Sequence, residues 1–216
     1  MNVLITGGSK GIGLAVAKLF EKDKVIITSR HKAKHLGLDS QIADVTKEED
    51  VKQLVKYVRE KYKKIDVLIM NAGIGLFKEV ENFSESDYDA IMNTNVKGLF
   101  LMMKHFKKLL SKNAQIITIS SMAANAQFPS GSIYCASKAA ALSFTNNIKT
   151  ELRDTNIKVC IVMPGSVDTD FFKSSGIKPN KERILTPKDV AKTIHYIANQ
   201  PKTSDIDQVI IRPAKK

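Results

Sequence analysis

The stretch Thr6-Gly7-Gly8-Ser9-Lys10-Gly11-Ile12-Gly13 follows directly on a short apolar run and leads into a helix-period stretch over residues 12–22. Its glycines therefore lie in a strand-to-helix turn. In such a turn Gly7 permits a tight bend, Gly11 lets the backbone approach a phosphate, and Gly13 allows the helix to pack closely on the strand. Free N–H groups and the dipole at the helix N-terminus attract anions. The stretch predicts a site for the pyrophosphate of a dinucleotide.

The rest of the chain alternates short apolar runs with longer helix-period stretches. The runs are continuous and β-branched, which is typical of strands buried on both faces of a parallel sheet. We expect strands at residues 3–5, 25–27, 67–70, 116–119, 159–162 and 209–211, a weaker strand at 41–43, and helices at 12–22, 47–62, 86–111, 133–154 and 187–199. The alternation predicts an α/β doubly wound sheet. A length of 216 residues fits one domain, 1–216.

Two features mark the boundaries of these elements. Ser86 and Thr186 suit helix N-caps, and Pro187 suits the first position of the last helix. Residues 170–186 show no periodicity and contain two serines, a glycine and a proline, so we expect a loop there. We interpret this loop as a short substrate lid.

Composition bounds the partners. The net charge is +12, which indicates either an anionic partner or a lysine-rich solvated surface, and the dispersed lysines favour the second. No nucleic-acid-binding signature accompanies the charge. No apolar run approaches the roughly 18 residues that span a bilayer, and the N-terminus does not read as a signal peptide. Two cysteines and scattered histidines predict neither a disulfide framework nor a metal site. We expect a cytoplasmic protein without membrane or nucleic-acid partners.

A second pattern carries chemistry: Tyr134 and Lys138 stand four residues apart in a stretch that reads as helix. Residues at this spacing share one helix face. A lysine beside a phenol favours the phenolate and lowers its pKa, so the tyrosine can exchange a proton with a carbonyl oxygen. The spacing occurs twice, because Tyr57 and Lys61 repeat it. We expect the second pair to lie away from the site, with Tyr57 at the surface.

The end of the second strand bears on the choice of cofactor. An NAD site usually has an acidic residue there, bonded to the ribose 2′-hydroxyl, but this chain reads Thr28-Ser29-Arg30. Arg30, helped by Lys10, suits a 2′-phosphate, because arginine–phosphate contacts are strong and geometrically specific. The alternative is that both are ordinary surface cations. We favour NADP(H) over NAD(H).

Together these residues resemble the short-chain dehydrogenase/reductase family over essentially the whole chain. Besides the glycine turn and the tyrosine–lysine pair, five segments match its motifs in order: Asp44-Val45, Asn71-Ala72-Gly73, Asn95-Val96-Lys97-Gly98, Ile119-Ser120-Ser121 and Pro164-Gly165-x-Val167-x-Thr169. Ser121 precedes Tyr134 by thirteen residues, as in the family. The resemblance implies a single Rossmann-type domain with a mostly parallel seven-stranded sheet of order 3-2-1-4-5-6-7 and helices on both faces.

The resemblance also assigns roles. Tyr134 donates a proton to the substrate oxygen, Lys138 lowers the phenol pKa and bonds the nicotinamide ribose, Ser121 orients the substrate, and Asn95 holds a water near Lys138. Alternatives are that Ser120 faces the site, or that Asn95 only bridges helix turns. The implied cofactor-binding residues are Gly7, Ser9, Lys10, Gly11, Ile12, Gly13, Arg30, Asp44, Val45, Asn71, Ala72, Gly73, Tyr134, Lys138, Pro164, Gly165, Val167 and Thr169.

The implied activity is NADPH-dependent interconversion of a carbonyl and an alcohol in a small-molecule substrate. A non-catalytic NADP-binding redox sensor or scaffold is the alternative, since fold alone does not fix function. The helical stretch 93–112 carries an apolar stripe of Leu99, Met102, Met103 and Phe106, which serves either the core or a subunit interface. The resemblance favours a homodimer or homotetramer.

Overall fold

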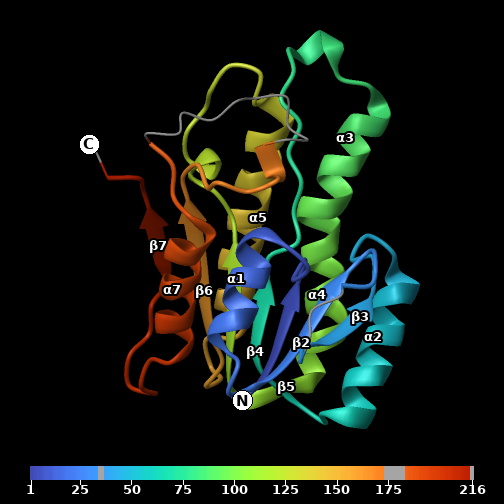
Figure 1. Cartoon of the computed structure of the whole chain (residues 1–216), viewed down its shortest axis with the longest axis vertical. Coiled ribbons are helices and arrows are strands. Elements are labelled where there is room, and N and C mark those ends of the chain that lie inside the picture. Colours follow the sequence, from blue (N-terminus) through green and yellow to red (C-terminus); the bar gives the residue numbers. More distant parts are fainter. Residues whose placement is uncertain (34–36, 173–182, 215–216) are drawn as a thin grey trace.

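The computed structural model of this chain, which describes residues 1–33, 37–172 and 183–214, is built on one parallel sheet (Figure 1). The strand order is β3-β2-β1-β4-β5-β6-β7, and every pairing between neighbours is parallel. Both the order and the fold class predicted from the sequence are confirmed. The strands are β1 (Asn2–Thr6), β2 (Lys24–Ser29), β3 (Asp39–Ile42), β4 (Ile65–Met70), β5 (Leu110–Ile119), β6 (Lys158–Pro164) and β7 (Gln208–Ile211).

Helices cover both faces of the sheet. On one face α2, α4 and α5 bury their apolar side chains against Leu4, Ile26, Leu68 and Ile116. On the other, α1 and α7 pack on the alternate strand residues, such as Ile5. The α-helices are α1 (Gly11–Leu19), α2 (Glu48–Lys61), α3 (Glu85–Met92), α4 (Gly98–Phe106), α5 (Ser132–Glu151) and α7 (Pro187–Ala198). Within the described ranges none of the helices has the length and apolar character needed to cross a membrane.

The helix expected over 86–111 is divided. A π-helical turn, η2 (Asn93–Lys97), separates α3 from α4, and β5 already begins at Leu110, which pairs with Ile65. A 3-10 turn, η3 (Lys107–Leu109), precedes the strand, so the helix prediction is wrong for residues 110–111. Leu110 is buried at the start of β5. A single apolar residue at this position fits a helical pattern as well as it fits a strand pattern.

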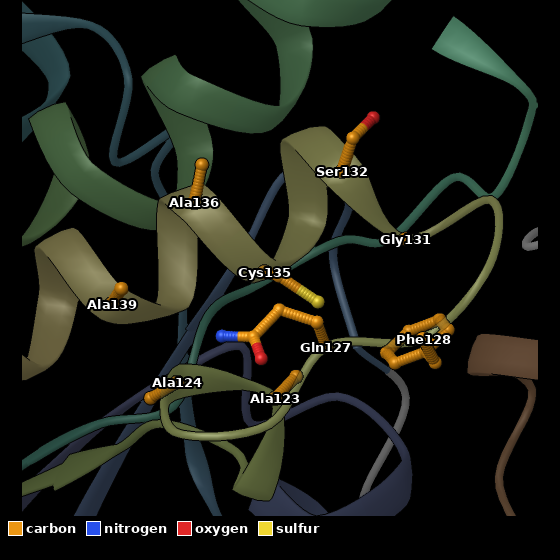
Figure 2. Close-up of a pocket in the computed structure, with 9 residues that line it drawn as sticks. All are labelled: Ala123, Ala124, Gln127, Phe128, Gly131, Ser132, Cys135, Ala136 and Ala139. Atoms are coloured by element: carbon orange, nitrogen blue, oxygen red, sulfur yellow. The ribbon is translucent and has the colours of Figure 1, made fainter.

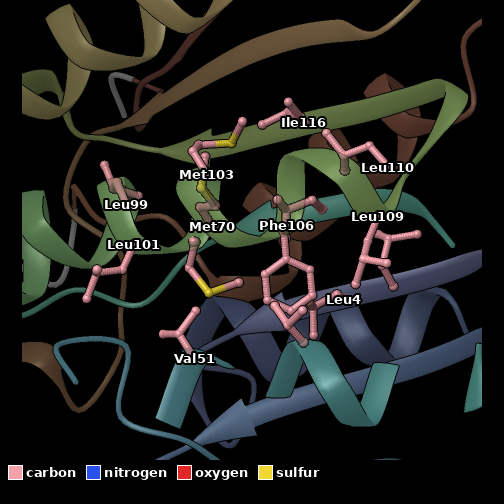
Figure 3. Packing of buried hydrophobic residues seen from close by; sticks show 14 of the residues in the cluster. Leu4, Val51, Met70, Leu99, Leu101, Met103, Phe106, Leu109, Leu110 and Ile116 are labelled. Carbon is pink, nitrogen blue, oxygen red and sulfur yellow. The ribbon is translucent and has the colours of Figure 1, made fainter. Parts of the chain in front are cut away.

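The apolar stripe of α4 belongs to the core. Leu99, Met102, Met103 and Phe106 are each no more than 6% exposed. Figure 3 shows the Phe106 ring pointing toward Leu4 of β1. The subunit-interface alternative for this stripe is therefore wrong, because the sheet already covers it.

Of the two predicted helix N-caps, Thr186 is confirmed and Ser86 is wrong. Thr186 caps α7 and forms a capping box with Asp189, with proline at the start of the helix. For α3 the cap is Ser84 rather than Ser86: Ser84 accepts a hydrogen bond from the Asp87 N–H, and the Asp87 side chain bonds back to the Ser84 N–H. The reciprocal pair of bonds selects Ser84, because it satisfies two donors at once.

The second tyrosine–lysine pair builds a structural cluster at the start of β3. One oxygen of Asp39 accepts hydrogen bonds from Tyr57 (2.6 Å), Tyr62 (2.5 Å) and Lys61 (2.8 Å). Tyr57 is half-buried and packs on the core, so the prediction that Tyr57 lies at the surface is wrong. Partial burial alone would raise the pKa of Asp39, but the hydrogen bonds from Lys61, Tyr57 and Tyr62 outweigh it and lower the pKa to about 2.

We expect Asp39→Asn to lower the free energy of unfolding by about 1–3 kcal/mol at pH 7, because buried hydrogen bonds to a charged acceptor are worth that much while the exposed Lys61 adds little. Because the folded-state pKa of Asp39 is lowered, this contribution is present above about pH 4 and is lost as the pH falls toward 2. Urea denaturation of the wild type and the variant at pH 7 and near pH 2 measures the contribution of Asp39 to the free energy of unfolding. Asp154→Asn, at a carboxylate 92% exposed, is the matched control, and equal effects of the two substitutions would refute the prediction.

Candidate active site

Most of the predicted site segments lie where strands end at one edge of the sheet. β1 runs into the glycine turn, β4 into Asn71, β5 into Ser121 and β6 into Gly165. Since all the strands are parallel, these segments share the carboxyl edge of the sheet (Figure 1). The order change between β1 and β4 makes this the switch point where ligands bind in open α/β sheets.

A set of hydrogen bonds joins the glycine turn to the end of β4. The Asn71 side-chain amide donates to the carbonyls of Thr6 (2.9 Å) and Gly7 (3.1 Å). In return, the Thr6 hydroxyl accepts from the backbone N–H groups of Asn71 and Ala72, both at 3.0 Å. A Cβ on Gly13 would clash with the Gly7 carbonyl and with the Asn71 amide. The first turn of α1 therefore packs directly on this junction, as predicted for Gly13.

Two further glycines of the turn, Gly7 and Gly11, have left-handed backbone conformations. Gly7 and Gly11 have φ values of +66° and +56°, a region that favours glycine. Gly11 faces Thr169, whose methyl group would lie 3.4 Å from an added Cβ. The segment after β6, held by the Gly165 N–H on the Ile211 carbonyl at 2.8 Å, thus lies beside the phosphate turn.

The predicted cations lie at the same edge. The Gly8 N–H donates to the Thr28 carbonyl at 3.0 Å, so the glycine turn lies against the end of β2. Arg30 and Lys10 are both exposed there. Asp44 is half-buried, and its carboxylate accepts two hydrogen bonds from Thr46, so its turn is fixed. Its neighbour Val45 is buried and touches Gly98.

Tyr134 and Lys138 come together on α5 at the end of β5. Both are buried, with exposures of 8% and 6%, and the ammonium nitrogen lies 5.9 Å from the phenol ring centroid. Lys138 donates to the Ile119 carbonyl at 3.2 Å. The Ser121 hydroxyl lies close enough to the Tyr134 phenol to act on its pKa, while the buried Ser120 donates to the Lys138 carbonyl at 3.2 Å. Ser121, rather than Ser120, is thus the serine beside the phenol.

The pKa shifts in this structure differ from the expectation. Burial raises the pKa of Tyr134 to about 12, and the nearby Ser121 hydroxyl only partly offsets this rise. Burial also lowers the pKa of Lys138 to about 8. The predicted lowering of the Tyr134 pKa is therefore wrong for this state of the protein. The physical reason is that desolvation disfavours the charged form of both groups.

Asn95 is fixed by three hydrogen bonds. Its side chain accepts from the Ile74 N–H and donates to the Ile74 carbonyl and to the Ser137 hydroxyl, all at 2.9 Å. Ser137 in turn donates to the Tyr134 carbonyl at 2.7 Å. A Cβ on Gly73 would lie 3.2 Å from the Asn95 oxygen and 3.4 Å from the Lys138 nitrogen. Asn95 therefore joins the segment after β4 to α5 and also borders Lys138.

Sequence reasoning missed an aromatic cluster around the phenol. Phe77 and Phe171 contact the Tyr134 ring with centroid separations of 5.2 and 5.6 Å, and Phe128 contacts Phe77 at 5.4 Å. These rings come from three segments far apart in the chain. Of the expected lid 170–186, residues 173–182 lie outside the described residues, and Phe171 belongs to the part that is described.

A hollow of about 230 Å³ lies between α5 and the segment that precedes it. Figure 2 shows the Cys135 side chain of α5 pointing toward Gln127 of that segment. None of the residues around the hollow is a predicted site residue. Its walls are Ala123, Ala124, Gln127, Phe128, Gly131, Ser132, Cys135, Ala136 and Ala139. In the described ranges no group of three or more histidine, cysteine or acidic side chains is placed to hold a metal.

Comparisons with known proteins agree with this geometry. A family model described as short chain dehydrogenase matches residues 1–180. An uncharacterised oxidoreductase of Staphylococcus aureus is 30% identical over 97% of this chain and 96% of its own length. A sepiapterin reductase of Chlorobaculum tepidum is 30% identical, covering 98% and 95%. The solved alcohol dehydrogenase of Thermococcus sibiricus, complexed with 5-hydroxy-NADP, superposes with a TM-score of 0.88 at 26% identity, covering 98% and 96%.

We expect Asn95→Ala to lower the free energy of unfolding by about 2–4 kcal/mol, because it removes three hydrogen bonds and leaves both backbone groups of Ile74 without their Asn95 partner, at a cost of roughly 1–3 kcal/mol for each unsatisfied group. Asn93→Ala is the control, since Asn93 lies in the same π-helical turn but is only partly buried. Thermal and urea denaturation of both variants measures the difference. Equal stabilities for the two variants would contradict the hydrogen-bonded role of Asn95.

Proposed function

The chain belongs to the short-chain dehydrogenase family, and from that premise we propose that it is an NADPH-dependent oxidoreductase that interconverts a carbonyl and an alcohol, with Tyr134 as general acid and base. One observation carries the proposal. The buried Tyr134 phenol has the Ser121 hydroxyl beside it and the Lys138 ammonium over its ring, at the carboxyl edge of the sheet. The same edge holds the glycine turn.

The residues of the turn fit a nicotinamide dinucleotide. Two left-handed glycines leave the backbone bare at the N-terminus of α1, where N–H groups and the helix dipole suit a pyrophosphate. Gly73 lies close to both Asn95 and Lys138 and puts no side chain beside them, so Lys138 is left to bond the nicotinamide ribose. When bound, the cofactor supplies hydride to the carbonyl carbon. The cofactor-binding residues predicted from the sequence therefore stay in the proposal.

The protein supplies the proton and the orientation. Ser121 donates a hydrogen bond to the carbonyl oxygen and holds it beside the phenol, and Tyr134 transfers its proton to that oxygen as the carbonyl carbon is reduced. With a pKa raised to about 12, Tyr134 is fully protonated at neutral pH and can act as the acid. Lys138, with a pKa lowered to about 8, is still mostly charged at pH 7 and can return a proton to the tyrosine. Such positioned acid catalysis is worth roughly 10²–10⁴ in rate.

The arrangement supports NADP(H) over NAD(H). Arg30 follows β2, where an acidic residue would bond the 2′-hydroxyl of NAD. Arg30 and Lys10 are exposed at the edge that the glycine turn shares with β2. Several similar solved structures are complexes with NADP or NADP⁺, and these relatives are 26–28% identical to this chain.

The non-catalytic alternative is not favoured. A sensor or scaffold needs the dinucleotide site, but not a phenol, a hydroxyl and an ammonium group brought together beyond it. Here Ser121, Tyr134 and Lys138 are brought together, and Asn95 borders them. We keep a cytoplasmic location and a homodimer or homotetramer within the proposal. The free thiols of Cys135 and Cys160 suit a reducing compartment.

We expect Tyr134→Phe to lower kcat for carbonyl reduction by roughly 10²–10⁴, because the ring stays while the transferable proton is lost. NADPH binding, followed by the change in nicotinamide fluorescence, should change by less than about threefold. Tyr88→Phe, which removes a hydroxyl from an exposed tyrosine of α3, is the control and should be neutral. If wild type and Tyr134→Phe bind NADPH and are equally inert against aldehydes, diketones and 3-ketoacyl compounds, the sensor alternative replaces the enzyme.

We expect Arg30→Asp to lower the ratio of kcat/KM with NADPH to kcat/KM with NADH by about 10²-fold, because it replaces a charge-assisted bond of roughly 1.5–3 kcal/mol with repulsion. Steady-state kinetics with both cofactors measures the ratio. Arg153→Asp makes the same change of charge at an arginine 74% exposed and controls for net charge. An unchanged ratio in Arg30→Asp would contradict the assignment of Arg30 to the 2′-phosphate.

A further inference from the structure

The phenol of Tyr134 stands in an aromatic surround that the transfer of hydride and proton does not require. Phe77 contacts Tyr134 edge to face, with centroids 5.2 Å apart. The centroid of the Phe171 ring lies 5.6 Å from that of Tyr134 and 6.0 Å from that of Phe77. Phe128 extends the set, because its ring centroid lies 5.4 Å from that of Phe77. Centroid separations of 4.5–7 Å are those of favourable aromatic pairs. The three phenylalanines thus form one continuous carbon surface beside the hydroxyl that faces the substrate.

Glycines make room for two of these rings. A Cβ on Gly75 would clash with the tip of the Phe171 ring, although the Gly75 backbone has no positive φ that would itself demand glycine. A Cβ on Gly131 would lie 2.6 Å from the Phe128 ring. The rings are therefore seated in space that missing side chains leave open. Phe171 in particular is placed against the segment that follows β4 and faces the phenol.

Two charged neighbours of this surface in the described part of the chain have other partners. Lys78, next to Phe77, forms an ion pair with Asp87 at 2.6 Å, and Lys138 donates to a backbone carbonyl. The hydroxyls of Ser121 and Tyr134 are assigned to the carbonyl oxygen. The part of the substrate that extends over the phenylalanine rings contacts only their carbon atoms. Burying a charged or polyhydroxyl group there without hydrogen-bond partners costs free energy.

We propose that Phe77, Phe128 and Phe171 select a carbonyl substrate whose substituent is an apolar ring, with Phe171 as the main specificity-determining residue. This inference rests on the proposed function, since it names the substrate class of the same site. The substituent stacks or packs edge to face on the phenylalanines, while the carbonyl oxygen reaches Tyr134 and Ser121. A carboxylate or polyol substituent is disfavoured by desolvation.

Three methyl ketones of similar intrinsic reactivity test the proposal: phenylacetone, pentan-2-one and 4-oxopentanoate, each reduced with NADPH. For the wild type we expect kcat/KM for phenylacetone to exceed that for pentan-2-one by at least about tenfold and that for 4-oxopentanoate by at least about 10²-fold, because contacts between aromatic rings add to area burial and a buried unpaired charge is penalised. Phe171→Ala should lower kcat/KM for phenylacetone about tenfold, mainly by raising KM. It should change kcat/KM for pentan-2-one by less than about threefold.

Two further variants and a control guard against a folding artefact. Phe171→Leu keeps an apolar side chain and should lose part of the aryl preference. Gly75→Ala removes none of the rings but displaces that of Phe171, so it should also lower the aryl preference. Phe100→Ala removes a phenylalanine that is 46% exposed on α4 and should leave the ratio unchanged. Melting temperature and NADPH binding identify any variant that is misfolded.

The outcomes separate the two proposals. The aromatic specificity is overturned if the wild type has the same kcat/KM for 4-oxopentanoate as for phenylacetone. It is also overturned if folded Phe171 and Gly75 variants keep the wild-type ratio of kcat/KM for phenylacetone to that for pentan-2-one. In either case the oxidoreductase proposal stands. If the wild type binds NADPH but reduces none of the ketones, and Tyr134→Phe makes no difference over the wider carbonyl panel, both are overturned.

Discussion

The hydrogen bonds between Asn71 and the glycine turn are the constraint on which the site depends. One side-chain amide joins the carbonyls of Thr6 and Gly7 to the end of β4. At this junction the strand order changes direction, because β2 lies on one side of β1 and β4 on the other. Beyond the strand ends the regular ladder of backbone hydrogen bonds stops, so side chains must satisfy part of the exposed backbone groups. Asn71 and Thr6 do so, and they thereby fix where α1 begins.

A second polar network extends this order to the catalytic helix. Asn95 holds both backbone groups of Ile74 and the hydroxyl of Ser137, and Ser137 bonds the Tyr134 carbonyl. Asn95 is only 2% exposed. A fully satisfied polar network in the interior is rigid, because each group would lose a partner if any member moved. The phenol is therefore placed by backbone and polar side chains from both β4 and α5, and its ring is flanked by carbon.

The sequence indicated the fold well, because the alternation of strands and helices and the positions of the glycines are local patterns, and the order of the motifs carried the family resemblance that implied the strand order. It indicated the site less completely. The π-helical turn at Asn95 was hidden in a continuous helical pattern, and it coincides with hydrogen bonds from Asn95 to Ile74, twenty-one residues earlier. The aromatic cluster was hidden because Phe77, Phe128 and Phe171 belong to no motif and meet only in three dimensions. Long-range contacts of this kind leave no periodic signal in a single sequence.

The two tyrosine–lysine pairs show why spacing alone cannot identify an acid–base site. In both, the residues stand four apart on a helix and the phenol and ammonium are neighbours. Lys61 is exposed and bonded to the Asp39 carboxylate, which raises its pKa, and the Tyr57 phenol donates to the same carboxylate, so both groups are committed to holding β3. Lys138 is buried with a backbone carbonyl as its partner, and its pKa is lowered to about 8. A lysine of lowered pKa can exchange protons near neutral pH, whereas one held by a carboxylate cannot. The environment of the pair, set by the junction of β4, β5 and α5, therefore decides its chemistry.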